Sequence, residues 1–266
     1  MRVSANELSS QLAKAFVGLG LPHGISRDAS EMVTWLELYG FETSNYLTDS
    51  LRLLEPSSTV QSPSLATTDN RLTIDLKGDS ALRSAALYLE LAAAKVATVG
   101  EITVSITHCP DAFWLLGYLP RLVKRGLTVK ADCQLPRDSE RVSLSFDERG
   151  SPILAERPQS SSRFAFDQSV IEVMLAPSLT NDQLISAMNL ASDEPAANEY
   201  PTSPPEKPSA TDSPHLSNET LNNRYQESLA RGLSISDELW AALKRYGENT
   251  LVEADEQSRQ GAGPSE

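Results

Sequence analysis

Residues that build metal centres and disulfide frameworks are scarce in this chain. Its 266 residues include two cysteines, Cys109 and Cys133, and three histidines. Neither cysteine lies in a Cys-x-x-Cys spacing, so the sequence predicts no zinc site and no other metal centre. Two isolated cysteines also favour a reducing, intracellular environment over a secreted, disulfide-stabilised fold.

Long apolar runs and basic residues are also lacking. No stretch of about 18 apolar residues occurs, and the opening segment MRVSANELSSQLAKAF has no run of signal-peptide length. We therefore expect a cytoplasmic protein without a membrane partner. The 23 Lys and Arg residues against 36 Asp and Glu give a net charge of −13. Such an acidic chain repels phosphate backbones, so a nucleic-acid partner is not expected.

Phosphate-binding glycine loops are missing as well. The 13 glycines are spread thinly, and the pattern Gly-x-Gly-x-x-Gly does not occur. The pair Gly18 and Gly20 follows an apolar helical pattern and is interpreted as the end of a helix. Because nucleotide phosphates are usually held by closely spaced glycines at a helix start, the sequence predicts no cofactor.

The patterning that is present predicts an α/β (α+β) fold. The segment from Ser4 to Glu7 has the capping-box pattern, and helically spaced apolar residues follow it. Three successive helical patterns make residues 1–55 an N-terminal helical unit. The third of them runs from Ser44 to Leu54.

A central α/β sheet domain is predicted over residues 70–190. Alternating strands and helices, with Pro120 splitting one helix, indicate a βαβ unit within a mixed sheet. A hairpin, a further strand and a short helix complete the domain. The predicted strands are 71–76, 101–108, 127–133, the hairpin 140–157 and 166–175, and the predicted helices are 79–98, 110–125 and 180–190.

Composition changes after the sheet domain. Six prolines lie between residues 195 and 214, so residues 192–216 are predicted to form a disordered linker. Helical patterns return within 217–254, and the last of them carries a hydrophobic side with Trp240 and Leu243. These C-terminal helices need a partner surface. We expect them to dock on the N-terminal unit, the alternative being another chain.

Three stretches resemble the malate/L-lactate/sulfolactate dehydrogenase family, a nicotinamide-dependent group of non-Rossmann type. They are VSANELSSQLAKAFVGLGLPHGISRDASEMVTWLELYGFETSNYL at 3–47, ITVSITHCPDAFWLLGYLPRLVKRGLTVKADC at 102–133 and SLARGLSISDELWAALKRYGENTLV at 228–252. The resemblance implies a reduced sulfolactate-dehydrogenase-like fold and, by carry-over, a homodimer. Shortened, uncharacterised bacterial relatives of that family are the most similar type.

The residues that carry chemistry in that family are changed here. The family's Ser-His-Gly, whose histidine takes the hydroxyl proton during hydride transfer, resembles Ser44-Asn45-Tyr46. Asn45 cannot exchange a proton near neutral pH. The family's first arginine corresponds to Tyr39, and its substrate-side arginine corresponds to Asp49, which reverses the charge expected to hold a carboxylate.

The middle stretch departs in the same way. The family's Asn-His pair corresponds to Asp111 and Ala112, while Phe113, Gly117 and Tyr118 match the pattern. The family's Gly-Thr-Asn-Pro cofactor turn does not occur. The resemblance therefore implies a retained scaffold with degenerate chemistry at Asn45, Asp49, Asp111 and Ala112.

A candidate cleft follows from these positions and from the predicted strand end at His108. That histidine is the best remaining candidate for chemistry, because ligands often bind where a strand of a βαβ unit meets its helix. Asp111 is expected to cap the helix that follows it, or else to contact a ligand. His108 and Cys109 should point to opposite faces and not form a nucleophilic pair. The candidate cleft residues are Tyr39, Ser44, Asn45, Tyr46, His108, Asp111, Phe113 and Tyr118.

The sequence thus indicates a non-catalytic, dehydrogenase-like binding or assembly protein, either a homodimer or bound to a partner enzyme. The alternative is a divergent oxidoreductase that binds NAD or NADP and acts on a small 2-hydroxy acid, with His108 or Asp111 as the base. A third reading is a small-molecule sensor or carrier that uses a cleft lined by Tyr39, Asn45, Tyr46, Phe113 and Tyr118.

Overall fold

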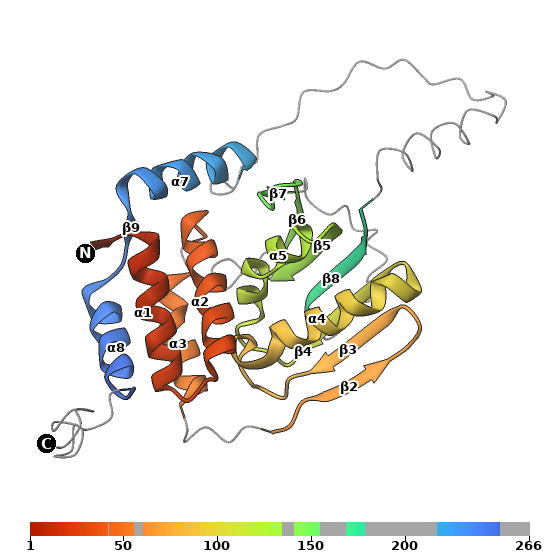
Figure 1. Cartoon of the computed structure of the whole chain (residues 1–266), viewed down its shortest axis with the longest axis horizontal. Helices are drawn as coiled ribbons and strands as arrows, with labels where there is room; N and C mark the ends of the chain where they lie inside the picture. The colour runs from red at the N-terminus through yellow and green to blue at the C-terminus, as the bar shows by residue number, and fades with distance from the viewer. Residues whose placement is uncertain (42, 56–60, 135–140, 155–168, 179–216, 251–266) are drawn as a thin grey trace, which may run out of the picture.

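The computed structural model describes residues 1–41, 43–55, 61–134, 141–154, 169–178 and 217–250. Figure 1 shows two regions side by side, a helical one that holds both the start and the end of the described chain and one built on a sheet. The predicted helix 180–190 and linker 192–216 lie outside the described residues, as do the first three residues of the predicted strand 166–175.

The N-terminal unit consists of α1 (Ala5–Gly18), α2 (His23–Leu38) and α3 (Ser44–Leu54). The predicted capping box is present. Glu7 N–H donates to Ser4 Oγ at 3.2 Å, and Ser4 N–H donates to Glu7 Oε2 at 2.8 Å. These bonds satisfy backbone donors that have no partner inside the helix. Helices α1 and α2 pack together through buried apolar residues, among them Leu8, Leu12, Phe16, Met32 and Val33.

The mixed sheet has seven described strands in the order β2-β3-β4-β8-β5-β6-β7. Their bounds are β2 (Ser64–Thr67), β3 (Arg71–Asp75), β4 (Ile102–Thr107), β5 (Leu127–Gln134), β6 (Arg141–Phe146), β7 (Pro152–Leu154) and β8 (Ser169–Pro177). Helix α4 (Ala81–Val99) connects β3 to β4, and these two strands are parallel neighbours, so the predicted βαβ unit is confirmed.

Strand β8 pairs antiparallel with both β4 and β5 and therefore separates them. The connection from β4 to β5 contains a 3-10 helix, η1 (Ala112–Gly117), and a short helix, α5 (Leu119–Val123). Pro120 lies in the first turn of α5, where its missing N–H costs nothing, so the predicted split of this helix is confirmed. The predicted hairpin is confirmed as the antiparallel pair β6 and β7.

The C-terminal segment packs back on the N-terminal unit, as expected. It consists of α7 (Asn218–Arg231), β9 (Leu233–Ser234) and α8 (Asp237–Glu248). Strand β9 pairs with β1 (Arg2–Val3), and α8 lies along α1 (Figure 1). The Tyr246 hydroxyl donates to Glu55 Oε1 at 2.6 Å. Buried Leu239 and Leu243 join the core that α1 begins.

Candidate functional site

The first turn of α3 holds Ser44, Asn45 and Tyr46, the three residues that the sequence aligned with the family's Ser-His-Gly. Asn45 is exposed there, and Ser44 and Tyr46 are half-buried. Thr43 precedes the helix, and its hydroxyl donates to the buried carboxylate of Glu37 at 2.9 Å. Asp49 is exposed one turn later and forms an ion pair with Arg52 at 3.1 Å.

Asp111 is buried, and its carboxylate binds the start of α4. The Ser80 hydroxyl donates to Asp111 Oδ2 at 2.5 Å, and Ala81 N–H donates to Oδ1 at 2.7 Å. Asp111 makes no side-chain hydrogen bond to η1, the helix that follows it. The prediction that it caps its own helix is therefore wrong. It caps a helix that begins 30 residues earlier in the chain, because β4 ends beside the start of α4 and brings the carboxylate to that helix terminus.

Burial controls the protonation of Asp111 and Cys109. Loss of solvent raises the pKa of Asp111, although hydrogen bonds from Ser80, Ala81 and Ser50 act in the opposite direction. Burial and the neighbouring carboxylate raise the pKa of the Cys109 thiol far above its usual range, and its Sγ lies 3.5 Å from Asp111 Oδ1. Cys109 therefore stays a neutral thiol and is unsuited to act as a nucleophile.

Side chains occupy the space between the start of α3 and η1. Trp114 is fully buried, and its Nε1–H donates to Ser50 Oγ at 2.8 Å. The rings of Tyr46 and Phe113 meet edge to face at 6.1 Å, and those of Phe113 and Trp114 lie 4.5 Å apart. The structure thus brings Tyr46, Phe113 and, through Ser50, Asp111 to one place. These residues pack against each other.

His108 lies at the carboxyl ends of the parallel strands β3 and β4 with its side chain in solvent. Its Nδ1 is 2.9 Å from Asp75 Oδ1. Its backbone has a positive φ of 46°, and its carbonyl accepts from Gly78 N–H at 2.7 Å. Cys109 is buried, so the two side chains do point apart, but both residues lie beyond the end of β4 at Thr107 and strand alternation is not the reason. Hydrogen bonding from Lys77 N–H, assisted by His108, lowers the pKa of Asp75.

Tyr39 and Tyr118 make contacts elsewhere. Tyr39 is buried under the ring of Tyr225, with centroids 4.7 Å apart, and burial raises its pKa. The Tyr118 hydroxyl donates to Glu90 Oε1 at 2.7 Å, and burial together with this carboxylate raises its pKa to about 12. Within the described residues, no hydrogen bond or ring contact joins either tyrosine to Tyr46, Asn45 or Asp111. Ala112 is fully buried.

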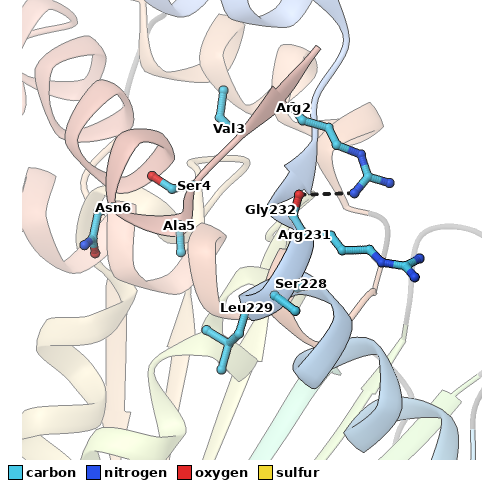
Figure 2. A pocket seen from close by; sticks show the side chains of 10 residues that line it. Arg2, Val3, Ser4, Ala5, Asn6, Ser228, Leu229, Arg231 and Gly232 are labelled. Carbon is cyan, nitrogen blue, oxygen red and sulfur yellow. Dashed lines mark hydrogen bonds between the residues drawn. The ribbon is translucent and has the colours of Figure 1, made fainter.

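Two open pockets lie at the junction of the chain ends, and the second of them reaches Glu37 and Gly40, on either side of Tyr39 in sequence. The larger, about 470 Å³, separates β1 and the start of α1 from the end of α7. Figure 2 shows the side chains of Arg2 and Arg231 extending to the same side, with Arg2 Nη1 donating to the Arg231 carbonyl at 3.1 Å. The second, about 330 Å³, shares Arg2 with it and reaches Glu37 and Glu227. Sequence reasoning missed both, because they are formed by segments from opposite ends of the chain.

Metal-binding clusters and membrane-spanning helices are both absent from the described part of the chain. No group of three or more His, Cys, Asp or Glu side chains there is arranged to hold a metal ion. None of the helices in the same part is long and apolar enough to cross a membrane.

Comparison with known proteins gives a fold but not an activity. Residues 3–86 match a family described as "Protein of unknown function (DUF3726)". No curated protein matches the sequence at a significant level.

Solved structures of dehydrogenases align along most of the chain. A dehydrogenase from Sinorhizobium meliloti is 11% identical, with a TM-score of 0.58, and the alignment covers 93% of this chain and 99% of that one. Malate dehydrogenase from Pyrococcus horikoshii is 10% identical, with a TM-score of 0.57 and coverages of 95% and 96%. Sulfolactate dehydrogenase from Methanocaldococcus jannaschii is 12% identical, with a TM-score of 0.52 and coverages of 94% and 98%. The chain therefore has the fold of these dehydrogenases, as its resemblance implied.

Proposed function

We propose that this protein is a non-catalytic, dehydrogenase-fold binding protein that acts in the cytoplasm, as a homodimer or on a partner enzyme. The observation that carries this proposal is the state of two positions, the one where the resemblance places the acid–base histidine and one that could supply a replacement base. One is the exposed amide of Asn45, and the other is Asp111, whose buried carboxylate binds Ser80 and the start of α4. A base must both reach a substrate proton and accept it. The Asn45 amide cannot accept a proton near neutral pH, and the Asp111 carboxylate is buried away from a substrate.

The packing between α3 and η1 supports the same proposal. A substrate needs an open space near the proton acceptor, and here the rings of Tyr46, Phe113 and Trp114 fill the region beside Asp111. Opening it would expose Trp114, which is fully buried and hydrogen-bonded to Ser50. Burial of an aromatic side chain stabilises a fold by about 1.5–3 kcal/mol, so the folded state resists such opening.

Cofactor binding is the direct test. We expect titration of the protein into NADH or NADPH to leave the nicotinamide fluorescence unchanged. Millimolar NAD(H) or NADP(H) should raise the melting temperature by less than about 1 °C. A cofactor that did bind, at a concentration far above its dissociation constant, would stabilise the folded protein by a few kcal/mol and shift the melting temperature by more. Tight binding or a larger shift would overturn the proposal.

The variant Asn45→His tests whether the protein lacks only the catalytic base or the rest of the active site as well. Asn45→His restores an imidazole at an exposed position and should not disturb the fold. We expect this variant to oxidise no 2-hydroxy acid with NAD or NADP, because the missing base is only one of the changes. Measurable NADH formation by Asn45→His alone would show that the rest of the active site is intact.

The second candidate is a divergent NAD(P)-dependent oxidoreductase acting on a small 2-hydroxy acid. The pair His108 and Asp75 favours it, because an imidazole oriented by a carboxylate at the ends of parallel strands is a common general base. This candidate predicts turnover that His108→Gln abolishes while the melting temperature stays constant. If the wild-type protein reduces no NAD or NADP with a panel of 2-hydroxy acids, the candidate fails.

A further inference from the structure

A row of polar side chains crosses the middle of the sheet. Its members are successive register partners on five strands: Thr73 of β3, Ser105 of β4, Glu172 of β8, Asp132 of β5 and Ser143 of β6. Side chains alternate between the two faces of a strand, and the positions that flank this row on β4 and β8 are apolar and belong to the buried core. The five residues, called the β8 polar row, therefore lie together on the face turned away from that core.

Glu172 places a buried carboxylate at the centre of this row. Its side chain is 1% exposed. Oε1 accepts from Ser105 Oγ at 2.8 Å and from Arg71 Nη1 at 2.9 Å. Oε2 is buried as well, and within the described residues it has no hydrogen-bond partner. A buried acceptor without a donor is costly, and such an atom commonly marks the place of a bound water, ion or ligand.

A second carboxylate faces Glu172 on the neighbouring strand. Asp132 of β5 is its direct register partner and is half-buried. The Ser143 hydroxyl donates to Asp132 Oδ1, which uses one of the two carboxylate oxygens. Like charges directly opposite each other on paired strands repel. A cationic donor between the two carboxylates would remove this repulsion and supply the hydrogen bond that Glu172 Oε2 lacks.

The cations of the chain that lie nearby do not complete this arrangement. Arg71 Nη1 is shared between Ser105 Oγ, at 2.7 Å, and Glu172 Oε1. One guanidinium balances the charge of one of the two carboxylates. Lys130 lies on the same face, two positions from Asp132, but it is exposed and bonds to neither carboxylate within the described part of the chain. Buried charges are normally paired, so a positive group from outside the described chain is expected here.

Arg71 also offers donors to a negative group. Its side chain is 39% exposed, and its Nε and Nη2 atoms make no hydrogen bond within the described residues. The Nε–H and Nη2–H groups of a guanidinium form a fork that binds a carboxylate with two parallel hydrogen bonds. Because Nη1 of the same guanidinium is bonded to Glu172, acceptors for an ammonium and donors for a carboxylate lie side by side. This is the charge pattern that complements an α-amino acid.

We propose that the β8 polar row and Arg71 bind an α-amino acid. Its ammonium group donates to Glu172 Oε2 and to Asp132, and its carboxylate accepts from Arg71 Nε and Nη2. An ammonium has three N–H donors and no acceptor, so it fits two carboxylates better than water does. A metal ion fits less well, because no group of three or more His, Cys, Asp or Glu side chains in the described chain is arranged to hold one.

The exposure of Arg71 gives the ligand a way in. Its guanidinium is held by Ser105 and Glu172 within the described residues, and its half-exposed side chain can move to admit the ammonium to the buried oxygen. The site goes beyond the function proposed above, since Asn45, Asp111 and His108 take no part in it.

Thermal unfolding of the full chain with each natural L-amino acid in turn provides the test. We expect at least one of them, well above its dissociation constant, to raise the melting temperature by at least about 3 °C. Isothermal titration then measures the dissociation constant of that amino acid. Mg²⁺, Ca²⁺ and K⁺ are added separately in the same way. A shift with a metal ion but with no amino acid, or a shift with none of these probes, would overturn the proposal, because a metal ion or water would then satisfy Oε2.

Two analogues of the amino acid that binds separate its two poles. The amino acid amide keeps the ammonium and loses the carboxylate, and the 2-hydroxy acid keeps the carboxylate and loses the ammonium. We expect each to bind at least about 10-fold more weakly than the amino acid, since each loses a charge-assisted contact. A 2-hydroxy acid that binds as tightly as the amino acid would contradict the role of Glu172.

Variants assign the two poles to residues. Glu172→Gln keeps the shape of the side chain and removes its charge, so it should weaken amino-acid binding at least about 10-fold. Arg71→Gln should weaken binding of the amino acid but not of its amide, a difference that a merely structural loss would not produce. Glu90→Gln is the matched control, because Glu90 is a carboxylate paired with Arg125 outside the row, and it should bind as the wild type does.

Circular dichroism checks that each variant is folded, and Asp132→Asn, at the less buried carboxylate, replaces Glu172→Gln if that variant does not fold. Unchanged affinity in the carboxylate variant and in Arg71→Gln, or an equal loss in Glu90→Gln, would overturn the proposal.

The same samples separate this inference from the proposed function. NADH titration of the wild type reports on the cofactor alone. A protein that binds both an amino acid and NADH would overturn the non-catalytic role and support this site. A protein that binds neither would overturn this site and leave the non-catalytic role in place.

Discussion

Asp111 connects two segments that are far apart in sequence. Its carboxylate accepts from Ser80 and Ala81 at the start of α4, and it is almost fully buried. The position is favourable because the positive end of the helix dipole lies there. It is also costly for a charge because solvent is excluded, and burial has the larger influence on its pKa.

Removing the Asp111 carboxylate should destabilise α4. We expect Asp111→Ala to lower the free energy of unfolding by about 1–3 kcal/mol, because it leaves the Ala81 N–H and the Ser80 hydroxyl buried without acceptors. Asp111→Asn should lower the free energy of unfolding by less, since its amide oxygen can still accept one of these two hydrogen bonds. Urea unfolding followed by circular dichroism measures both, and equal losses would contradict this account.

The raised pKa of Asp111 predicts a pH dependence with a definite sign. A folded-state pKa above the unfolded value means that the folded protein binds the proton more tightly. The stabilisation that the protonated Asp111 carboxyl gives the folded protein is therefore complete below the unfolded pKa, and it is lost as pH rises through the folded pKa. As pH rises from acid toward neutral, the free energy of unfolding of the wild type should thus fall relative to that of Asp111→Asn, which has no carboxyl to ionise. Urea unfolding across that range checks the direction.

Backbone strain near the β3–α4 turn gives a third residue-scale prediction. Lys77 is exposed and has a positive φ of 51°. Residues with a Cβ atom rarely adopt this conformation, whereas glycine does so readily. Lys77→Gly keeps the backbone bond to Asp75 and should stabilise the protein by about 0.5–1 kcal/mol. Thermal unfolding measures the change, and Lys130→Gly, at an exposed strand position, should destabilise instead.

At the scale of elements, two glycines allow helices to approach closely. A Cβ at Gly117 of η1 would lie 2.3 Å from the carbonyl oxygen of Met32 in α2. A Cβ at Gly18 of α1 would lie 1.8 Å from the carbonyl oxygen of Tyr246 in α8. Backbone atoms cannot yield as a flexible side chain can, so these glycines set the spacing between the helical unit and its neighbours.

Gly117→Ala should therefore separate η1 from α2. We expect a loss of about 1–3 kcal/mol, the usual cost of overpacking. Gly24→Ala is the matched control, because a methyl group added at Gly24 in α2 would meet no atom within 4 Å and alanine favours helix. Chemical denaturation should show the first variant destabilised and the second unchanged or stabilised. Equal stability of the two would contradict the close approach.

At the scale of the whole molecule, the chain closes on itself through its ends. The Met1 amino group lies 3.0 Å from Asp237, and β1 pairs with β9. The C-terminal segment also contributes buried apolar side chains to the core. They are Leu221, Leu233, Ile235, Leu239 and Leu243.

Truncation after residue 216 should consequently prevent stable folding. Each buried leucine or isoleucine stabilises by about 1.5–3 kcal/mol, and typical domains have only about 5–15 kcal/mol in total. A chain ending at residue 250 keeps all five side chains and serves as the control. Circular dichroism should show cooperative unfolding for the control alone. A cooperative transition in the shorter chain would mean that the C-terminal helices are not part of the core.

Local patterns in the sequence were sufficient for most elements. The capping box at Ser4, the helix Ser44–Leu54, the split at Pro120 and the β6–β7 hairpin all follow from spacing and turn chemistry within a few residues. The resemblance to dehydrogenases also gave the fold. It placed Asn45 at the start of a helix, where the structure has it exposed.

By itself, the sequence determined most of the helices and strands, because these depend on neighbouring residues. It did not predict β1, β2 or β9, whose pairing partners lie elsewhere in the chain. Only the tertiary structure decided that β8 lies between β4 and β5, and that Asp111 caps α4 in place of its own helix. It also decided that ring side chains fill the region between α3 and η1. These features depend on contacts between residues that lie tens of positions apart in the chain, which no local pattern records.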